Sequence, residues 1–367
     1  MSKSLEDARY MAVALALGRR GLGRTWPNPA VGAVIVKDGV MIGRGWTQPG
    51  GRPHAETEAL RAAGLAAKGA TLYTTLEPCS HHGKTPPCAD ALIAAGIERV
   101  VAALEDPNPE VAGQGLARLR EHGIAVELGV GEEEARRAHA GHIRRMQEGR
   151  PHVMLKLAVS ADGKAGLAGR RPAAITGEEA RARVHLLRAM SDAIMTGIGT
   201  ALADDPLLTC RLPGMKNRSP LRIVLDPELR LPTDGRLALS AREVPLWVIA
   251  GANISGDRRA ELEKLGVQVL RTRTGGNGID LAAVMQLLGD RGITRLMIEG
   301  GPRIAASFVK ADLVDEAALL RSSDALGPDG LEAIEGLPLE ALTKSPRLKS
   351  CTVEALGRDS IEMFERA

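Results

Sequence analysis

Apolar residues keep two different spacings in the first part of the chain, and each spacing predicts a different element. Over 10–17 they recur with helical spacing behind a capping-type start at Ser4, which predicts a helix. The run 31–36 is β-rich, and Asp38-Gly39 is a strong hairpin signal before the apolar run 40–42. Strands that alternate with helices of ordinary length predict a layered α/β sheet. Further strands are predicted at 71–76 and 99–104, and further helices at 55–67, 88–95 and 116–122.

The charged stretch 132–147 has a helical pattern that Gly149 and Pro151 interrupt, and we place a domain boundary there. We expect one domain over 1–147 and a second over 148–367, which suits a chain of 367 residues. The second part again alternates strands with helices, so it too is predicted to be α/β. Its strands are predicted at 152–159, 192–196, 221–226, 246–250, 267–270 and 294–299.

Composition narrows the classes of partner. Hydrophobic residues make up 44% and charged residues 25%, and the apolar run 11–17 is far too short to span a membrane. A net charge of +3 gives no support to a nucleic-acid partner, and aromatic residues at 2% leave few stacking platforms. A small phosphorylated ligand needs only a few local cations, so this class stays open. A homo-oligomer is compatible with the sequence, which does not set the oligomeric state.

Four cysteines are spread over the chain, and only Cys79 and Cys88 lie close together. That distribution is typical of metal binding in a reducing cytosol and not of a disulfide framework. The first ten residues lack the basic-then-apolar pattern of a secretory leader. We therefore expect a cytoplasmic protein.

Three short motifs together predict a zinc site. His54 stands at a helix start, Cys79 follows a predicted strand, and Cys88 opens another helix. One imidazole and two thiolates are a common ligand set for catalytic zinc, with the fourth position left for water. Glu56, two residues after the histidine, need not bind the metal and can accept and donate the proton of that water. This order of residues is the one found in zinc nucleobase deaminases, although eight residues separate the cysteines here.

A structural zinc is the main alternative for this site. Structural zinc sites use four protein ligands, and His81 or His82 could supply the fourth. The two alternatives differ on chelation, because a structural zinc is needed for the fold and a catalytic zinc only for activity.

The motifs resemble those of the bifunctional riboflavin-biosynthesis deaminase/reductase family over nearly the whole chain. The spacing of the two cysteines is that family's own version of the deaminase signature. The resemblance implies a cytidine-deaminase-like three-layer αβα domain, followed by a dihydrofolate-reductase-like α/β domain. It rests on TWPNPAVG at 25–32, HAE at 54–56, TLEPCSHHGKTPPC at 75–88, KLAVSADG at 156–163, TALADDPLLT at 200–209 and EGGP at 299–302.

In the first domain the resemblance implies hydrolytic deamination of a diamino-ribosylamino-pyrimidinone 5′-phosphate. His54, Cys79 and Cys88 would hold one zinc ion per chain, and Glu56 would be the catalytic proton carrier. The implied substrate contacts are Asn28, His81 and Lys84.

In the second domain the resemblance implies NADPH-dependent reduction of the ribosyl group to a ribityl chain. The glycine turn at 300–301 suits this, because it follows an apolar strand and precedes a helix whose first N–H groups can bind an anion. The implied NADPH contacts are Val159, Ala174, Thr200, Asp204, Gly301, Pro302, Arg303, Ile304, Ala305, Ala306 and Ser307. The implied substrate contacts are Pro172, Arg188, Leu208, Arg211 and Glu299, of which the two arginines suit phosphate oxygens.

The second domain also departs from the family's pattern in two places. The segment 172–176 reads PAAIT, where the family usually carries an aromatic residue, and 321–327 lacks the usual Ala-Pro. A single-activity base or tRNA deaminase with a non-catalytic C-terminal domain is therefore the alternative function. The near-balanced charge argues against tRNA.

Overall fold

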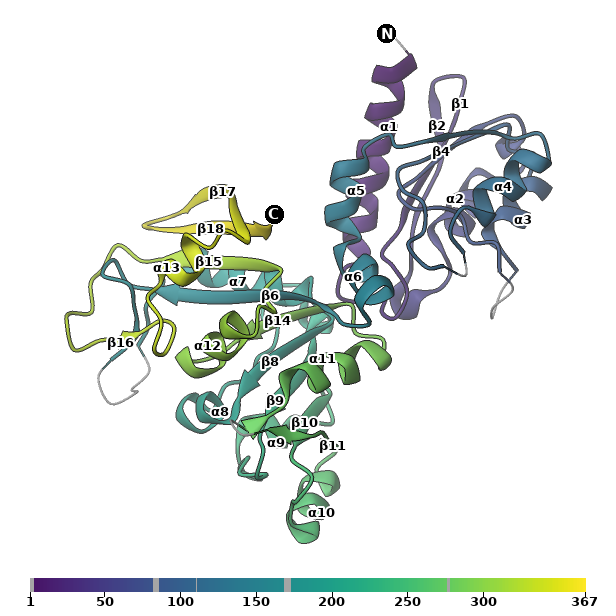
Figure 1. Ribbon diagram of the computed structural model, residues 1–367. Coiled ribbons are helices and arrows are strands. Elements are labelled where there is room, and N and C mark those ends of the chain that lie inside the picture. The colour runs from purple at the N-terminus through teal and green to yellow at the C-terminus, as the bar shows by residue number, and fades with distance from the viewer. Residues whose placement is uncertain (1–2, 82–85, 110, 168–172, 276–277) are drawn as a thin grey trace. The chain divides into compact units, whose positions relative to one another are not determined.

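Two separate β-sheets organise the chain, one in each of the units 1–150 and 151–367 (Figure 1). The computed structural model describes residues 3–81, 86–109, 111–167, 173–275 and 278–367. We refer to the two parts as the N-terminal and the C-terminal unit.

The N-terminal unit is built on a five-stranded sheet with the order β2-β1-β3-β4-β5. β2, β1 and β3 are antiparallel neighbours, whereas β3, β4 and β5 run parallel. The strands are β1 (Gly32–Lys37), β2 (Val40–Trp46), β3 (Thr71–Thr74), β4 (Arg99–Ala102) and β5 (Ala125–Leu128).

Helices cover both faces of this sheet, which gives the three layers that the sequence predicted (Figure 1). The first and fifth helices lie on one face, and the second, third and fourth on the other. The helices are α1 (Lys3–Gly18), α2 (Ala55–Ala63), α3 (Cys88–Ala94), α4 (Gln114–Glu121), α5 (Glu132–Ala138) and α6 (Ala140–Glu148).

Close packing and one buried ion pair hold the layers together. α2 lies directly on β2, because a Cβ atom at Gly45 would come within 2.3 Å of the carbonyl oxygen of Ala55. On the other face, Asp7 of α1 accepts hydrogen bonds from Tyr73 Oη at 2.8 Å and from both terminal nitrogens of Arg99, at 2.8 and 2.7 Å. Both contacts fix helices to the sheet without help from a ligand.

The C-terminal unit has a nine-stranded sheet with the order β11-β10-β9-β8-β14-β6-β15-β18-β17. It is parallel from β11 to β15 and ends in two antiparallel strands. The strands are β6 (His152–Val159), β8 (Ala193–Gly197), β9 (Leu221–Leu225), β10 (Leu246–Ala250), β11 (Gln268–Arg271), β14 (Arg295–Glu299), β15 (Glu316–Arg321), β17 (Leu348–Leu356) and β18 (Asp359–Arg366). Two short ladders pair β7 (Lys164–Gly166) with β16 (Leu331–Glu332) and β12 (Thr274–Gly275) with β13 (Gly278–Ile279).

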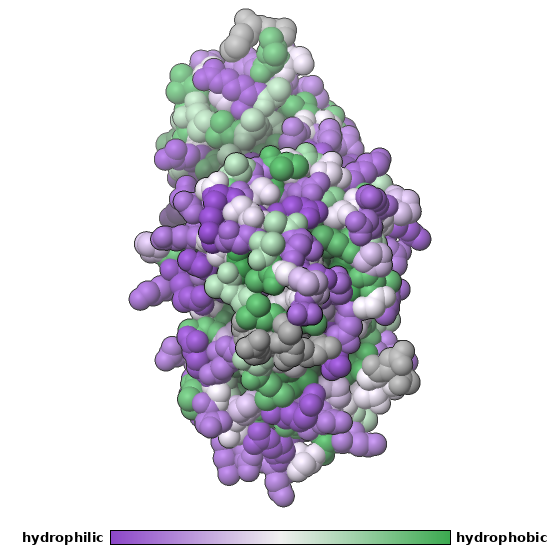
Figure 2. Space-filling model, turned by 90° about the vertical axis from the view of Figure 1, so that its left-hand side faces the viewer, coloured by the Kyte–Doolittle hydropathy of each residue, from purple (hydrophilic) through white to green (hydrophobic). Residues whose placement is uncertain are grey.

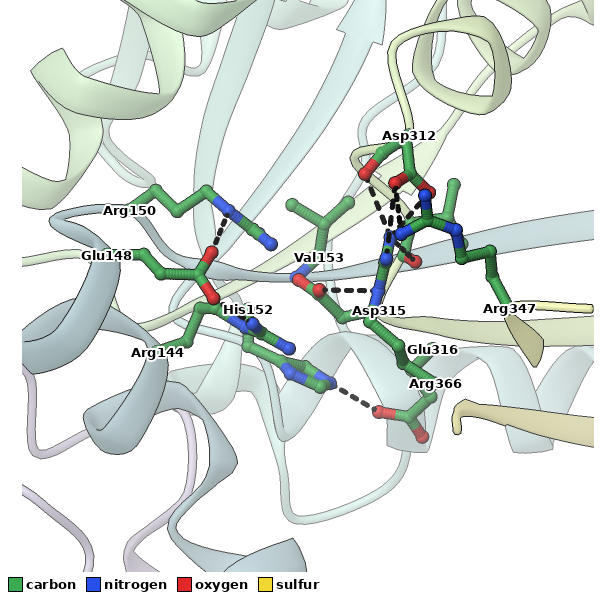
Figure 3. A network of polar contacts seen from close by, with 11 residues as sticks. Arg144, Glu148, Arg150, His152, Val153, Asp312, Asp315, Glu316, Arg347 and Arg366 are labelled. Atoms are coloured by element: carbon green, nitrogen blue, oxygen red, sulfur yellow. Dashed lines mark hydrogen bonds and ion pairs between the residues drawn. The ribbon is translucent and has the colours of Figure 1, made fainter. Parts of the chain in front are cut away.

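Polar contacts fasten the strand ends of this unit (Figure 3). The carboxylate of Asp315 accepts a hydrogen bond from the backbone N–H of Val153 at 2.9 Å, which links the start of β6 to the start of β15. Asp312 pairs with both Arg347 and Arg366, each at 3.0 Å. The helices of the unit are α7 (Glu178–Ala189), α8 (Ile198–Asp204), α9 (Arg236–Leu239), α10 (Gly256–Lys264), α11 (Leu281–Asp290), α12 (Pro302–Lys310) and α13 (Glu340–Thr343).

Two predicted helices are wrong in their extent. The single helix predicted over 132–147 is two helices, which meet at His139, where the backbone leaves helical geometry. His139 is buried, and its Nε2 lies 3.0 Å from Thr75 Oγ1, so a core contact takes precedence over helix continuity. The helix predicted over 55–67 ends at Ala63, because Gly64 adopts a positive φ of 55° and a 3₁₀ turn follows.

Aliphatic residues, alanine and methionine fill the cores, as the scarcity of aromatic residues predicted. Hydrophilic residues are distributed over the face seen in Figure 2, with smaller hydrophobic patches between them. Among the described residues, no helix combines the length and the apolar character that crossing a membrane would require.

Candidate active sites

The structure brings the three predicted zinc ligands together. His54 immediately precedes α2, Cys79 lies beyond the end of β3, and Cys88 is the first residue of α3. The Nδ1 atom of His54 lies 3.6 Å from Cys79 Sγ and 3.3 Å from Cys88 Sγ. Tetrahedral zinc with ordinary bond lengths would place nitrogen and sulfur about 3.6 Å apart. The donor set and its spacing therefore fit a zinc ion.

Donors around Cys79 favour its thiolate. The hydrogen bond with the Cys88 thiol, and those with His54 and the backbone N–H of Cys88, lower the pKa of Cys79. The N–H contact, 3.3 Å from Cys79 Sγ, comes from the first turn of α3, so the helix N-terminus itself stabilises negative sulfur. These surroundings suit Cys79 as an anionic metal ligand.

Glu56 is buried beside these ligands and is only 3% exposed. Burial raises the pKa of Glu56 to about 7, and the nearby His54 only partly opposes this effect. A carboxyl group with such a pKa can both accept and donate a proton near neutral pH. Its place in the first turn of α2 keeps it next to the donor atoms while leaving the metal coordination to His54 and the cysteines.

The described part of the chain offers three ligands at this site and no fourth. Within it, the cluster that could hold a metal consists of His54, Cys79 and Cys88, whereas His81 is exposed and is not part of the cluster. His82 lies outside the described residues. Three protein ligands from the described residues match the number that catalytic zinc sites use.

Of the predicted pyrimidine contacts, Asn28 has a clear geometry. Its Nδ2 donates a hydrogen bond to the carbonyl oxygen of Gly51 at 2.8 Å, three residues before His54. That bond fixes the amide plane and leaves its oxygen as the group for a ligand. His81 is exposed, and Lys84 lies outside the described residues.

In the C-terminal unit, three charged side chains meet at the end of β14. Arg188 and Glu299 are predicted substrate contacts, and Lys156 is their neighbour. Arg188 of α7 binds both carboxylate oxygens of Glu299 at 2.8 Å, and Lys156 of β6 places Nζ 3.6 Å from the same carboxylate. Although burial opposes ionisation, Lys156 and Arg188 lower the pKa of Glu299 to about 2. Glu299 is therefore ionised, and it occupies most of the fork that Arg188 would offer to a phosphate.

The segment after α8 is tied to the same cluster. The carbonyl oxygen of Thr209 accepts a hydrogen bond from Arg188 at 3.0 Å and lies 3.1 Å from His185 Nδ1. Leu208 is buried with a positive φ of 54°, so its backbone is held in an unusual conformation. Arg211 is exposed, which leaves it as the predicted arginine that can reach a substrate phosphate.

The predicted cofactor segment begins at the N-terminus of α12. Gly301 precedes the helix, and its N–H donates to Thr200 Oγ1 at 2.9 Å. The side chains of Ile304, Ala305 and Ala306 are buried in the core. A ligand contact from 301–307 would thus come from the first N–H groups, since the Ser307 hydroxyl donates to the Arg303 carbonyl at 2.9 Å.

The remaining predicted cofactor and substrate residues differ in how far they are exposed to solvent. Val159 is the buried last residue of β6, Asp204 ends α8, and Ala174 is exposed. Pro172 lies outside the described residues. The divergent segment 321–327 is held by Asp162, whose carboxylate accepts the N–H groups of Leu326 and Gly327 at 3.0 and 2.8 Å.

Two residues with notable contacts, Lys156 and Glu77, were given no role from the sequence. Lys156 was part of a recognised motif without a role, and its charge becomes significant only because β6 and β14 are neighbours that pair it with Glu299. Glu77 stands two residues before Cys79 as an ordinary acidic residue, yet it is buried with four backbone hydrogen bonds. No local sequence signal marks either contact, since both depend on residues distant in the chain.

Each unit of the chain matches the model of a known protein family. The family model described as the cytidine and deoxycytidylate deaminase zinc-binding region matches residues 4–104. The family model described as the RibD C-terminal domain matches residues 151–361.

Similar proteins match over the full length. The riboflavin biosynthesis protein RibD of Escherichia coli is 43% identical, covering 97% of this chain and 98% of that protein, and that of Aquifex aeolicus is 41% identical, covering 98% of each. The structure of Acinetobacter baumannii RibD has a TM-score of 0.88 at 36% identity and covers all of both chains. That of a diaminohydroxyphosphoribosylaminopyrimidine deaminase/5-amino-6-(5-phosphoribosylamino)uracil reductase from Thermotoga maritima has a TM-score of 0.85 at 33% identity, over 99% of each. The fold prediction, a cytidine-deaminase-like domain before a dihydrofolate-reductase-like domain, is confirmed, and the chain belongs to the RibD family of bifunctional riboflavin-biosynthesis deaminase/reductases.

Proposed function

We propose that the N-terminal unit deaminates a diamino-ribosylamino-pyrimidinone 5′-phosphate at a zinc ion held by His54, Cys79 and Cys88. The observation that carries this proposal is the convergence of the three donor atoms within 4.8 Å of one another, beside the buried Glu56. When bound, zinc supplies the Lewis acidity that makes water a nucleophile at neutral pH. The substrate class follows from the name of the Thermotoga relative.

The protein's own groups have distinct tasks in this reaction. Glu56 would carry two protons in turn, one from the attacking water to the ring nitrogen and one from the hydroxyl group of the resulting adduct to the departing amine, so its raised pKa suits both directions. Asn28, held by Gly51, presents an amide oxygen to a ring N–H or amine. His81 and Lys84 complete the proposed substrate contacts.

We infer that the C-terminal unit reduces the ribosyl group with NADPH. Ligands bind at the carboxyl edge of parallel sheets, and β6, β14 and β8 place Val159, Glu299 and Gly197 at that edge. NADPH would use N–H groups in the first turn of α12, since the N–H of Gly301 already donates to Thr200 Oγ1. Arg211, whose side chain is exposed, is the proposed phosphate contact.

One assay tests both halves. The full-length protein is incubated with the diaminopyrimidinone nucleotide, with and without NADPH, and the products are identified by mass. We expect the deaminated ribosyl compound without NADPH and the ribityl compound with it. Ammonia release without any NADPH oxidation would overturn the reductase proposal alone, whereas a substrate left unchanged in both samples would overturn the deaminase proposal.

A further inference from the structure

Glu77 makes an unusual set of contacts just before the first cysteine ligand. One carboxylate oxygen accepts hydrogen bonds from the backbone N–H groups of Asp106 at 3.0 Å and Gly113 at 2.9 Å. The other accepts from Gly115 at 2.7 Å and Leu116 at 3.2 Å. Four such bonds offset part of the cost of burying a carboxylate that is only 3% exposed.

Two of these donors belong to the first turn of α4. The residue before that helix is Gly113, which has no side chain to cap it, so Glu77 caps α4 from a distant part of the sequence. The contact is close, because a Cβ atom at Gly115 would lie 2.0 Å from the carbonyl oxygen of Pro78. The peptide that leads into Cys79 is therefore seated directly on α4.

The same helix also reaches the second cysteine. Arg118 of α4 pairs with Asp90 of α3 at 2.7 Å, and Asp90 lies two residues after Cys88. Arg118 also donates to the carbonyl oxygen of Ser80 at 3.5 Å. One side chain thus contacts the segments of both thiolates.

Contacts between Cys79 and α3 complete a ring. The N–H of Cys88 donates to Cys79 Sγ at 3.3 Å, and the N–H of Ala89 donates to the carbonyl oxygen of Cys79 at 3.1 Å. From Cys79 the ring runs through α3 and Asp90 to Arg118, along α4 to Glu77, and back through Pro78. Such a closed ring restrains the separation of the two sulfur atoms more than a single contact could.

We propose that Glu77 and Arg118 are positioning residues for zinc, which act through α4 to set the spacing of Cys79 and Cys88. This inference rests on the proposed zinc function of these ligands. The helix that carries it lies beyond the matched zinc-binding region, which ends at residue 104. Groups that orient metal ligands typically change metal affinity by about 10–100-fold when they are replaced.

The test measures metal binding by the full-length protein and three variants. Zinc affinity is obtained by competition with a chromogenic chelator, and the Co²⁺-substituted proteins are compared by their thiolate charge-transfer and visible bands. Glu77→Gln should weaken zinc binding by about 10–100-fold and alter the Co²⁺ spectrum. Arg118→Met keeps the apolar stem and should weaken binding less, because the ion pair with Asp90 is partly exposed.

Arg136→Met is the matched control, because its ion pair with Glu132 is also on a helix of this unit and its side-chain contacts among the described residues stay within that helix. Amide hydrogen exchange of β1 in the metal-free proteins reports whether the unit is folded. Wild-type affinity and spectrum in both Glu77→Gln and Arg118→Met would overturn the proposal. If the amides of β1 are not protected from exchange in Glu77→Gln, that variant is unfolded, and the result for Arg118→Met alone decides the test. Wild-type protein that binds no zinc would instead contradict the proposed function.

Discussion

At the scale of single residues, burial prepares Glu56 for its proposed task. Its raised pKa comes first from desolvation, and the same burial keeps bulk water away from the reacting groups. Glu58, on the same helix, is instead paired with Arg61 at 2.6 Å in a partly exposed position. Two carboxylates two residues apart therefore have different chemistry because they face different surroundings.

Replacing Glu56 by glutamine should separate the two activities. Glutamine keeps the size of the side chain but cannot take a proton from water, so deamination should fall by about 10²–10⁴-fold. Zinc content should stay the same, since Glu56 is not a ligand here, and NADPH-dependent reduction of the deaminated substrate should be unchanged. Glu58→Gln is the control that should leave both rates intact. An equal loss of both activities in Glu56→Gln would contradict two separate sites.

Glu299 should give the C-terminal unit a defined acid sensitivity. Its folded pKa of about 2 is below the ordinary value of 4.5, so the ionised carboxylate stabilises the fold above about pH 4.5. That contribution is lost as the pH falls from about 4.5 towards about 2. Glu299→Gln should therefore melt below wild type at pH 7, and the difference should shrink at pH 3. The exposed Glu263→Gln serves as control, and a difference that stays constant with pH would count against the assignment.

At the scale of elements, the contact between α2 and β2 decides where the metal ligands stand. His54 and Glu56 both depend on the start of α2, and that helix can approach the sheet only because β2 has Gly45 beneath it. The position of the site is thus set by the backbone packing of α2 on β2.

Gly45→Ala should damage this arrangement. In a strand, alanine ordinarily stabilises by restricting the unfolded chain, by about 0.4–1 kcal/mol. Here the added Cβ would meet the Ala55 carbonyl oxygen at 2.3 Å, and overpacking costs about 1–3 kcal/mol, so we expect net destabilisation. Zinc affinity should fall as well, because α2 must shift. Thermal melting and chelator competition measure both effects. In Gly256→Ala the added Cβ meets no atom within 4 Å beyond its chain neighbours and its own helix, so this variant should melt no lower than wild type and should bind zinc unchanged.

The strands and helices also show which features could be predicted from the sequence and which could not. Buried strands such as β6 and β9 were predicted nearly to the residue, because continuous apolar runs leave few alternatives. β15, β17 and β18 were not predicted. Of these, β17 lies at the sheet edge with seven consecutive exposed residues and has no alternating pattern to detect. The candidate zinc ligands could be predicted because three short motifs occur in a recognisable order. Glu77 and Lys156 were not, because their partners come from distant segments.

At the scale of the whole molecule, the two sites belong to units with separate cores. The zinc donors all lie between residues 54 and 88, and the Lys156–Arg188–Glu299 cluster lies in the C-terminal unit. The N-terminal unit has an extensive cluster of buried apolar residues that runs from Tyr10 to Ala135. We therefore expect its fold to depend less on zinc than that of a small zinc finger does.

Removing zinc from the intact chain should consequently abolish one activity and spare the other. After treatment with a strong chelator, deamination should be lost while reduction of the deaminated substrate continues at its original rate. Hydrogen exchange of β1 should remain protected, because α1 and α2 stay fixed by the Asp7–Arg99 pair and by the packing at Gly45. Added zinc should restore deamination, whereas added magnesium should not, since nitrogen and sulfur donors do not suit it. Loss of β1 protection on chelation would show that the zinc is structural, and loss of reduction would show that the two units depend on each other.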